Sequence, residues 1–327
     1  MISNVLLSRT DRIGDLILST PAIATVRASF PQARIRMIVS PYNRVVMERN
    51  GDVDELIDLP AGTSPARFGR EQGRFDVAIA LAPRAIDLQL AGGTRAAVRV
   101  GYTYERRWVA RLTAPLYVNR LMISEADPEL CERDPHRVVR HEVEQLLDLV
   151  ALGGARQRVD RLRLDLTDAD RTVARTLPAS PIVVHLGKRW LSNGSTLDGT
   201  LSVVATLARL GPVVVTCPEE SDEVSPAFER LPGVARVLRD LPFFQWAAVF
   251  EHARVVVTVD TGATHVASAT RRPTVVAFEH RYFRLNSQEW APYGVPHVFV
   301  RKPIREDSES LVRFRDEIVG GVATLLR

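Results

Sequence analysis

Residues 254–269 read RVVVTVDTGATHVASA. The β-branched run at 254–259 predicts a buried strand. Asp260, Thr261 and Gly262 then form a short polar turn, and the small residues after them predict a helix over 262–270. A buried strand that passes through a polar loop directly into a helix is the building unit of an open α/β sheet.

The same unit recurs along the whole chain, so we predict an α/β protein with parallel sheets covered on both faces. Strands are expected at 2–7, 34–39, 77–81, 97–100, 181–186, 213–217, 254–259 and 274–278. Helices are expected near 15–29, 43–49, 84–91, 135–152, 196–209, 244–252, 262–270 and 306–326.

The length of 327 residues suggests two domains, one over 1–160 and one over 175–327. The polar stretch at 155–180 is the expected boundary, with Asp168 as a helix N-cap. No window offers the ~18 uninterrupted apolar residues of a membrane-spanning helix. Charges interrupt the first apolar stretch, which argues against a signal peptide, so a cytoplasmic protein is expected.

The basic residues of the chain are almost all arginines. The formal net charge is only +4, and among 43 basic residues the sole lysines are Lys188 and Lys302. This balance permits an anionic substrate or membrane surface as a partner but does not demand one. Cys131 and Cys217 are too few for a disulfide framework or a zinc site, so we read both as ordinary thiols.

The first expected strand runs into a polar loop, residues 8–15 (SRTDRIGD). Gly14 allows a close backbone approach to a ligand, and Asp15 stands at a helix start. The loop lacks both the glycine-rich dinucleotide fingerprint and the P-loop pattern. Two readings of Asp15 remain open: an acid that stabilises the helix start, or a functional carboxylate.

The loop after the 254–259 strand is a candidate anion site. The amides of Thr261, Gly262 and Ala263 would point at a ligand phosphate along the helix axis. A plain helix cap by Asp260 is the alternative. His265, one turn into the helix, is either a core histidine or a second phosphate donor.

Together these segments resemble glycosyltransferase family 9, the ADP-heptose:lipopolysaccharide heptosyltransferases. The resemblance runs almost end to end and is most specific at 260–267. It is carried by 12–22 (RIGDLILSTPA), 30–31 (FP), 75–79 (FDVAI), 99–102 (RVGY), 260–267 (DTGATHVA) and 290–294 (WAPYG).

The resemblance implies a GT-B architecture of two facing Rossmann-like domains, with the acceptor on 1–160 and the nucleotide sugar on 175–327. The final helix could pack back on the first domain. It implies inverting, metal-independent transfer of heptose from ADP-heptose to a lipopolysaccharide inner-core sugar. Asp15 would be the general base, and the loop from Asp260 to His265 would hold the diphosphate. Thr10, Arg12 and Gly14 would form the acceptor-side loop.

The resemblance also sets the expected partners. These are a nucleotide-sugar donor, an anionic glycolipid acceptor and a peripheral contact with the inner face of the cytoplasmic membrane. No cofactor, metal ion or nucleic acid is expected. Arginines at 99, 106, 107 and 111 could meet the acceptor or form a solvated basic face. The D-x-D triplets at 52–54 and 168–170 read as loop and cap acids. His136 and His141 lie five apart on one expected helix, a spacing that does not place two metal ligands on one face.

The sequence departs from the family in the donor half. Many members carry a lysine where this chain has 192–195 (SNGS), and Lys188 or Arg189 could replace it. Residues 278–281 (FEHR) stand where a Gly-Pro turn is usual. Glu219 or Glu220 could bind the ribose or be a helix-start charge. Two alternatives therefore remain: the same fold with another nucleotide sugar or acceptor, and a nucleotide-binding module without transferase activity.

Overall fold

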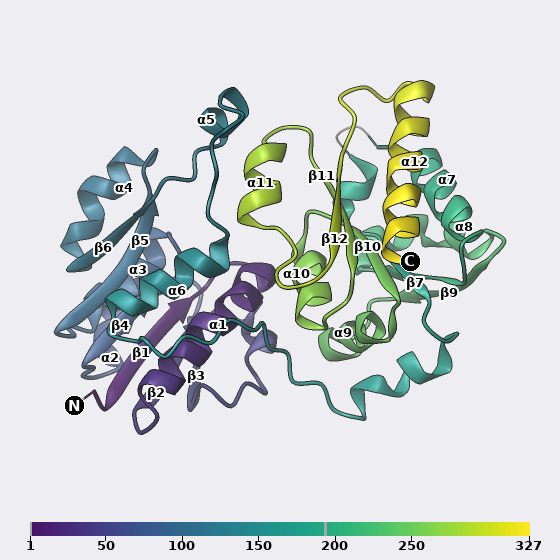
Figure 1. Ribbon diagram of the computed structural model, residues 1–327. Coiled ribbons are helices and arrows are strands. Elements are labelled where there is room, and N and C mark those ends of the chain that lie inside the picture. Colours follow the sequence, from purple (N-terminus) through teal and green to yellow (C-terminus); the bar gives the residue numbers. More distant parts are fainter. Residues whose placement is uncertain (1, 193–194) are drawn as a thin grey trace. The chain divides into compact units, whose positions relative to one another are not determined.

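The computed structural model describes residues 2–192 and 195–327. The chain forms two compact units, Met1–Leu164 and Asp165–Arg327 (Figure 1). The division falls within the polar stretch at 155–180. Each unit has its own parallel sheet and its own helices, and we describe them separately.

The first unit holds a six-stranded sheet in the order β3-β2-β1-β4-β5-β6. Its strands are β1 (Asn4–Arg9), β2 (Arg34–Val39), β3 (Glu55–Asp58), β4 (Val77–Ala80), β5 (Val98–Tyr104) and β6 (Arg120–Ser124). Its helices are α1 (Ile13–Ser29), α2 (Pro65–Glu71), α3 (Ala85–Gly93), α4 (Trp108–Thr113), α5 (Pro128–Arg133) and α6 (Glu142–Leu152), with 3₁₀ turns η1 (Arg44–Val46) and η2 (Ala114–Leu116). This strand order is that of a doubly wound Rossmann-like sheet.

The second unit repeats the same winding, in the order β12-β11-β10-β7-β8-β9. Its strands are β7 (Ile182–His185), β8 (Val213–Cys217), β9 (Val234–Arg239), β10 (Val255–Val259), β11 (Thr274–Phe278) and β12 (His297–Arg301). Its helices are α7 (Leu197–Leu207), α8 (Ser225–Glu229), α9 (Phe243–His252), α10 (Gly262–Ala269), α11 (Phe283–Glu289) and α12 (Ser308–Leu325), with 3₁₀ turns η3 (Asp170–Thr172), η4 (Ala174–Thr176), η5 (Lys188–Leu191) and η6 (Glu219–Val224).

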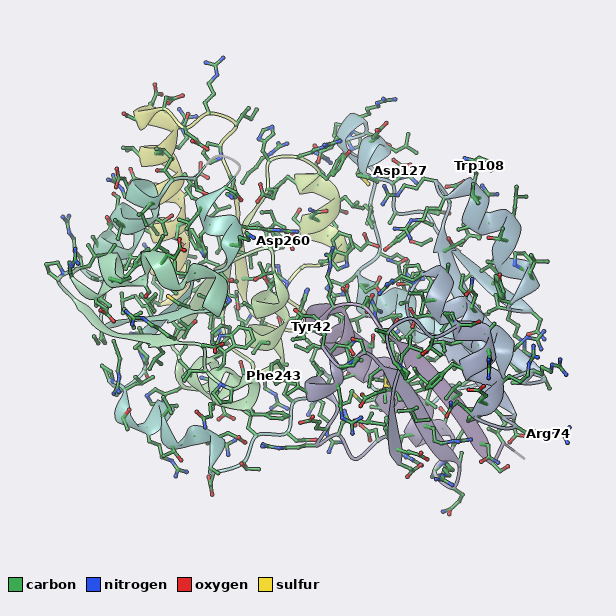
Figure 2. The ribbon with its side chains drawn as sticks, turned by 180° about the vertical axis from the view of Figure 1, so that it is seen from behind. Tyr42, Arg74, Trp108, Asp127, Phe243 and Asp260 are labelled. Carbon is green, nitrogen blue, oxygen red and sulfur yellow. The ribbon has the colours of Figure 1, made fainter. Side chains whose placement is uncertain are left out.

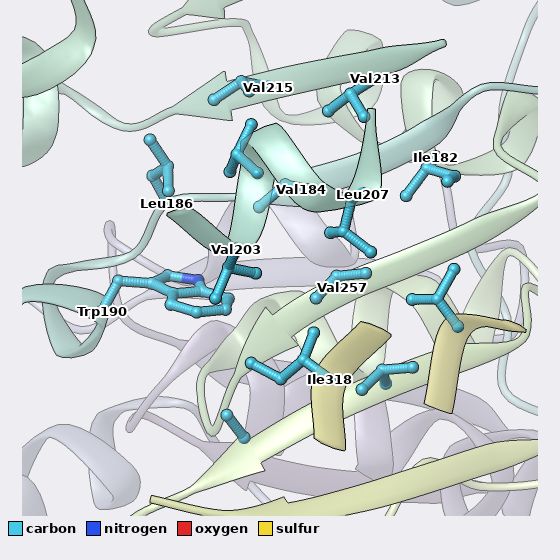
Figure 3. Packing of buried hydrophobic residues seen from close by; sticks show 14 of the residues in the cluster. Ile182, Val184, Leu186, Trp190, Val203, Leu207, Val213, Val215, Val257 and Ile318 are labelled. Atoms are coloured by element: carbon cyan, nitrogen blue, oxygen red, sulfur yellow. The ribbon is translucent and has the colours of Figure 1, made fainter. Parts of the chain in front are cut away.

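All strand pairings of the described residues are parallel, so the predicted α/β class with two Rossmann-like sheets is confirmed. The core of the second unit shows how the sequence achieves this (Figure 3). Valines of β7, β8 and β10 meet Val203 and Leu207 of α7 and Ile318 of α12. Trp190 is fully buried among them, and its indole N–H donates to the His185 carbonyl at 2.7 Å. The final helix α12 thus packs on the sheet and α7 of its own unit.

Three local predictions were wrong. The helix expected at 135–152 begins only at Glu142, because His141 caps it by accepting a hydrogen bond from the Val143 amide at 3.1 Å. His136 therefore lies outside that helix. Asp168 is not a helix cap, because its carboxylate instead pairs with Arg175 at 2.8 Å. The stretch at 43–49 forms only the short turn η1.

Candidate functional site

The predicted functional loops lie at the switch points of the two sheets. In the first unit the strand order reverses between β1 and β4, and in the second between β7 and β10. Open α/β sheets bind ligands at such points, outside the carboxyl ends of the strands. The loop with Asp15 follows β1, and the loop with Asp260 follows β10.

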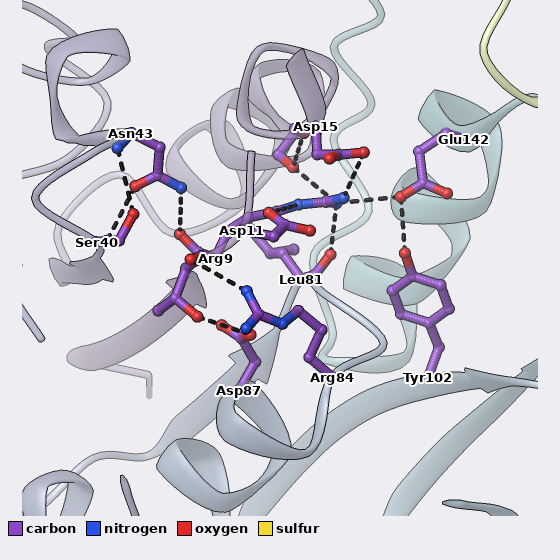
Figure 4. A network of polar contacts seen from close by, with 12 residues as sticks. Arg9, Asp11, Asp15, Ser40, Asn43, Leu81, Arg84, Asp87, Tyr102 and Glu142 are labelled. Carbon is purple, nitrogen blue, oxygen red and sulfur yellow. Dashed lines mark hydrogen bonds and ion pairs between the residues drawn. The ribbon is translucent and has the colours of Figure 1, made fainter. Parts of the chain in front are cut away.

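A buried arginine organises the loop after β1. Arg9, the last residue of β1, is 1% exposed. Its guanidinium donates to the carboxylates of Asp11 at 3.0 Å and Glu142 at 3.1 Å (Figure 4). It also donates to the Ser19 hydroxyl at 3.1 Å and the Leu81 carbonyl at 2.6 Å. Burial alone would lower the pKa of Arg9, but the surrounding carboxylates raise it well above its usual value, so this side chain stays charged.

Asp15 lies in the first turn of α1, and its carboxylate is 3.4 Å from the Arg9 guanidinium. Its side chain is 21% exposed. Burial raises the pKa of Asp15 from 3.8 to about 7, with Arg9 opposing the rise and Asp11 adding to it. The N-cap of α1 is the exposed Arg12, and Gly14 is buried inside the helix. A carboxyl group that titrates near neutral pH and reaches solvent suits general-base work.

A second carboxyl group with a raised pKa lies beside this loop. Asp87, in the first turn of α3, is fully buried and accepts a hydrogen bond from the Thr10 hydroxyl at 3.0 Å. Arg84 donates to the Thr10 carbonyl at 3.2 Å. Burial raises the pKa of Asp87 to about 7, and its Oδ1 has no hydrogen-bond partner among the described residues. Asp87 was not among the site residues predicted from the sequence, although an acid at the helix start after a buried strand could have indicated it.

Glu142 completes the network from α6. Its carboxylate accepts from Arg9 and, at 2.7 Å, from the Tyr102 hydroxyl (Figure 4). Burial and the Glu142 charge raise the pKa of Tyr102 well above its usual value, so the phenol remains a donor. Hydrogen bonds to Glu142 of α6 thereby link Arg9 of β1 with Tyr102 of β5, and Asp15 lies beside this Arg9.

In the second unit, Arg189 binds the loop after β10. Its guanidinium donates to the Asp260 carbonyl at 2.7 Å and the Asp260 carboxylate at 2.8 Å. Helix α10 begins at Gly262, and its N-cap is Thr261. The reading of Asp260 as a plain helix cap is therefore wrong. A Cβ on Gly187 would approach the Thr261 methyl group to 3.4 Å, so the loops after β7 and β10 lie close together.

The other predicted donor residues have different settings. Lys188 is exposed, whereas His265 is buried in α10 beside Ala263. Glu219 and Glu220 stand in η6, and their side chains lie outside the described residues. The structure thus brings Arg189, Asp260 and Thr261 together.

The second lysine has an unexpected place. Lys302 is fully buried, and its ammonium group donates to the carbonyls of Arg189 and Ser192 and pairs with Glu279 at 3.2 Å. Burial lowers the pKa of Lys302, and Glu279 opposes this shift. Both lysines and the unusual stretch with Glu279 stood out in the sequence, but the ion pair between Lys302 and Glu279 was not predicted. Glu279 supplies the counter-charge for a lysine that fixes the backbone of Arg189.

The acids considered as metal ligands have structural partners. Asp54 accepts from Arg27 and from the Ile35 amide, both at 2.6 Å, and Asp52 pairs with Arg163 at 3.1 Å. Asp170 accepts from the Thr167 amide at 2.7 Å. Among the described residues there is no group of three or more His, Cys, Asp or Glu that could hold a metal ion. In the same residues no helix is both long and apolar enough to cross a membrane.

Comparison with known proteins supports a specific class. The model of glycosyltransferase family 9 (heptosyltransferase) matches residues 202–315. No curated protein matches the sequence. Among solved structures, a family 9 glycosyl transferase from Veillonella parvula is 18% identical with a TM-score of 0.77, covering 99% of this chain and 97% of that chain.

Two structures from E. coli are also similar. ADP-heptose lps heptosyltransferase II is 17% identical with a TM-score of 0.72, covering 99% of this chain and 98% of that one. Heptosyltransferase WaaC with ADP-2-deoxy-2-fluoro heptose is 19% identical with a TM-score of 0.65, covering 96% and 99%. At these identities the structures establish a shared fold. Together with the family model they identify the chain as a glycosyltransferase. The predicted resemblance to family 9, the heptosyltransferase family, is confirmed.

Proposed function

We propose that this glycosyltransferase moves a heptose from ADP-heptose to a sugar of the lipopolysaccharide inner core, with inversion and without a metal ion. The family model supports heptose as the sugar. The similar structure with ADP-2-deoxy-2-fluoro heptose supports an adenine nucleotide sugar as the donor. In this proposal the acceptor, an anionic glycolipid, binds the first unit at the loop with Thr10, Arg12 and Gly14, and the donor binds the second unit.

The observation that carries the proposal is the raised pKa of Asp15. Its carboxyl pKa of about 7 makes it a stronger base than an ordinary aspartate, yet it is substantially ionised at neutral pH. In the reaction, the Asp15 carboxylate takes the proton of the acceptor hydroxyl while that oxygen attacks the anomeric carbon. The bond from the anomeric carbon to the diphosphate oxygen breaks, and ADP leaves. A single displacement inverts the centre without a covalent intermediate.

The leaving diphosphate needs positive charge or hydrogen-bond donors. The amides at the start of α10, from Thr261 to Ala263, supply donors, because the first N–H groups of a helix have no partner within it. Arg189 supplies the cation, held against Asp260 by two hydrogen bonds. Lys188, the residue before Arg189, is exposed and can add a second positive charge. Glu219 or Glu220 would bind the ribose.

Two alternatives remain for the test. The first alternative is the same fold with another nucleotide sugar or acceptor. It is favoured by Glu279, which lies in the stretch 278–281 where the resemblance leads us to expect a Gly-Pro turn, and which pairs with Lys302. A nucleotide-binding module without transferase activity is the alternative from another class. Calorimetric titration with ADP, UDP, GDP and CDP separates the donors, because the proposal requires tight binding of ADP alone. Preference for another nucleotide would reject ADP-heptose, and turnover of any sugar nucleotide would reject the inactive module.

A further inference from the structure

The short helix α4 of the first unit exposes its large apolar side chains. Trp108 is 68% exposed, Leu112 71% and Leu116 76%, and α4 contains no buried residue. Figure 2 shows Trp108 at the surface of the molecule. Single exposed apolar residues are ordinary, but a cluster of large ones marks an interaction surface. We call this cluster, with Val109 and Ile123, the α4 face.

Three residues of the α4 face lie around one hollow. Trp108 and Leu112 lie four residues apart and therefore on one side of the helix, and Leu116 follows one turn later in η2. Trp108, Leu112 and Ile123 of β6 line a common hollow of about 420 Å³ together with Arg111. Trp108 and Leu112 of α4 and Ile123 of β6 thus form a single patch, and Val109 and Leu116 are further exposed apolar residues next to them in the sequence.

Arginines accompany these apolar side chains. Residues 105–120 contain four arginines, at 106, 107, 111 and 120, and one acid, Glu105. Arg106 and Arg107 lie over the Tyr104 ring, at 5.4 Å and 4.9 Å from its centroid. Glu105 and Glu125 stand where β5 and β6 end, and the Glu105 amide bonds the Ser124 carbonyl there. The helix itself carries only positive charge.

We propose that the α4 face binds an anionic lipid surface. A Trp with aliphatic neighbours and arginines is the composition of helices that lie in a membrane interface. The apolar groups enter the headgroup region, and the arginines meet lipid phosphates. A six-residue helix is too short to be stable by itself, and the apolar contacts absent within the protein would be made with lipid.

The position of the α4 face gives this contact a purpose that rests on the proposed function. Helix α4 follows β5 and so begins at the carboxyl edge of the sheet, the edge that also holds Asp15. Arg107 donates to the Pro83 carbonyl at 3.0 Å, two residues from Leu81, whose carbonyl accepts from Arg9. Docking of α4 would therefore bring a glycolipid embedded in the same membrane to the edge that carries Asp15.

Co-sedimentation with vesicles that contain no glycan tests this proposal separately from transfer. The full chain should bind vesicles of phosphatidylcholine with about one quarter phosphatidylglycerol, bind phosphatidylcholine alone weakly, and lose affinity at high salt. Trp108→Ser with Leu112→Ser should lower the affinity about tenfold or more, because two large apolar groups no longer leave water. Leu210→Ser with Val312→Ser, two exposed apolar positions of the second unit, is the matched control and should bind normally.

A second measurement locates the contact. Bromine-labelled acyl chains should quench the fluorescence of the wild-type chain and quench Trp108→Phe much less, since that variant keeps an apolar ring. The proposal is overturned if the Trp108→Ser, Leu112→Ser variant binds vesicles as tightly as the wild type. It is also overturned if the wild type binds no vesicles. A dimer that this variant dissociates would then assign the α4 face to a second copy of the chain.

Discussion

The Arg9 guanidinium lies 3.4 Å from the Asp15 carboxylate, and the same buried arginine also contacts Asp11 and Glu142. One cation therefore faces three carboxylates. The pKa of Asp15 is the outcome of this balance, because burial raises it and Arg9 holds it down to about 7. A base of this strength depends on keeping Arg9 charged and in place.

Replacing Arg9 tests that balance. Arg9→Gln should raise the pKa of Asp15 above 7 and move the acid limb of kcat/KM to higher pH, because the opposing cation is lost. It should also lower the free energy of unfolding by ~3–5 kcal/mol, since buried carboxylates lose their partner. Arg9→Lys keeps the charge and should shift the limb less. Arg34→Gln, which removes an exposed pair with Glu55, should cost under ~1 kcal/mol and leave the limb unmoved. If the acid limb of kcat/KM lies at the same pH in Arg9→Gln as in the wild type, Arg9 does not control the pKa of Asp15.

Asp87 predicts a pH-dependent stability. Its pKa is raised from 3.8 to about 7 in the folded state, so its stabilising contribution is complete below 3.8 and is lost as the pH rises to about 7. Asp87→Asn removes this loss and can still accept from Thr10. Relative to the wild type, its free energy of unfolding should improve by up to ~2–3 kcal/mol between about pH 5 and about pH 8.

Urea denaturation at the two pH values measures this change. The pKa of Asp54 is lowered by hydrogen bonds from Ile35 and Arg27, so the stability it contributes is lost only as the pH falls below the ordinary range. Asp54→Asn should therefore cost similar amounts at both pH values. If the Asp87→Asn difference is also the same at both, Asp87 does not carry the raised pKa.

The donor loop predicts unequal roles for two neighbouring cations. Arg189→Gln should weaken ADP binding about tenfold, because a charge-assisted contact at the diphosphate is lost. Lys188→Gln should weaken it less, since Lys188 is exposed while Arg189 is fixed to Asp260. Isothermal titration with ADP compares the two variants directly. An unaltered dissociation constant in Arg189→Gln would remove Arg189 from the donor site.

The two lysines of the chain, Lys302 and Lys188, offer a matched stability test. Lys302→Met should lower the free energy of unfolding by ~3–5 kcal/mol, because it leaves Glu279 and two main-chain carbonyls without their buried cation. Lys188→Met, at an exposed position, should change it by less than ~0.5 kcal/mol. Lys302→Met combined with Glu279→Met should recover part of the loss. Equal effects of the two lysine variants in urea denaturation would contradict the role of Lys302.

The sequence predicted the inner strands of both sheets and none of the edge strands. The eight expected strands correspond to β1, β2, β4 and β5 and to β7, β8, β10 and β11. The four missed strands, β3, β6, β9 and β12, are the outermost ones. Inner strands are buried on both faces and read as apolar runs, whereas edge strands carry charges such as Glu55 and Arg120 that mask the pattern.

The candidate site was predictable only as far as local sequence reaches. Asp15 and the loop from Asp260 to His265 were found because each follows an apolar strand and starts a helix. The role of Arg9 was missed because its partner Glu142 is 133 residues away, and the role of Lys302 because it contacts Arg189, which is 113 residues away. Local patterns carry no information on such contacts, because these depend on which strands and helices are neighbours in the fold.

The most direct test of the account is the transfer rate of Asp15→Asn, measured with ADP-heptose and an inner-core acceptor across pH. The wild type should show an acid limb of kcat/KM near pH 7. The variant keeps the size of the side chain but cannot take the proton, so kcat should fall by about 10²–10⁴ while ADP binding is retained. Transfer at the wild-type rate by Asp15→Asn, with the same acid limb, would contradict the assignment of Asp15 as the base.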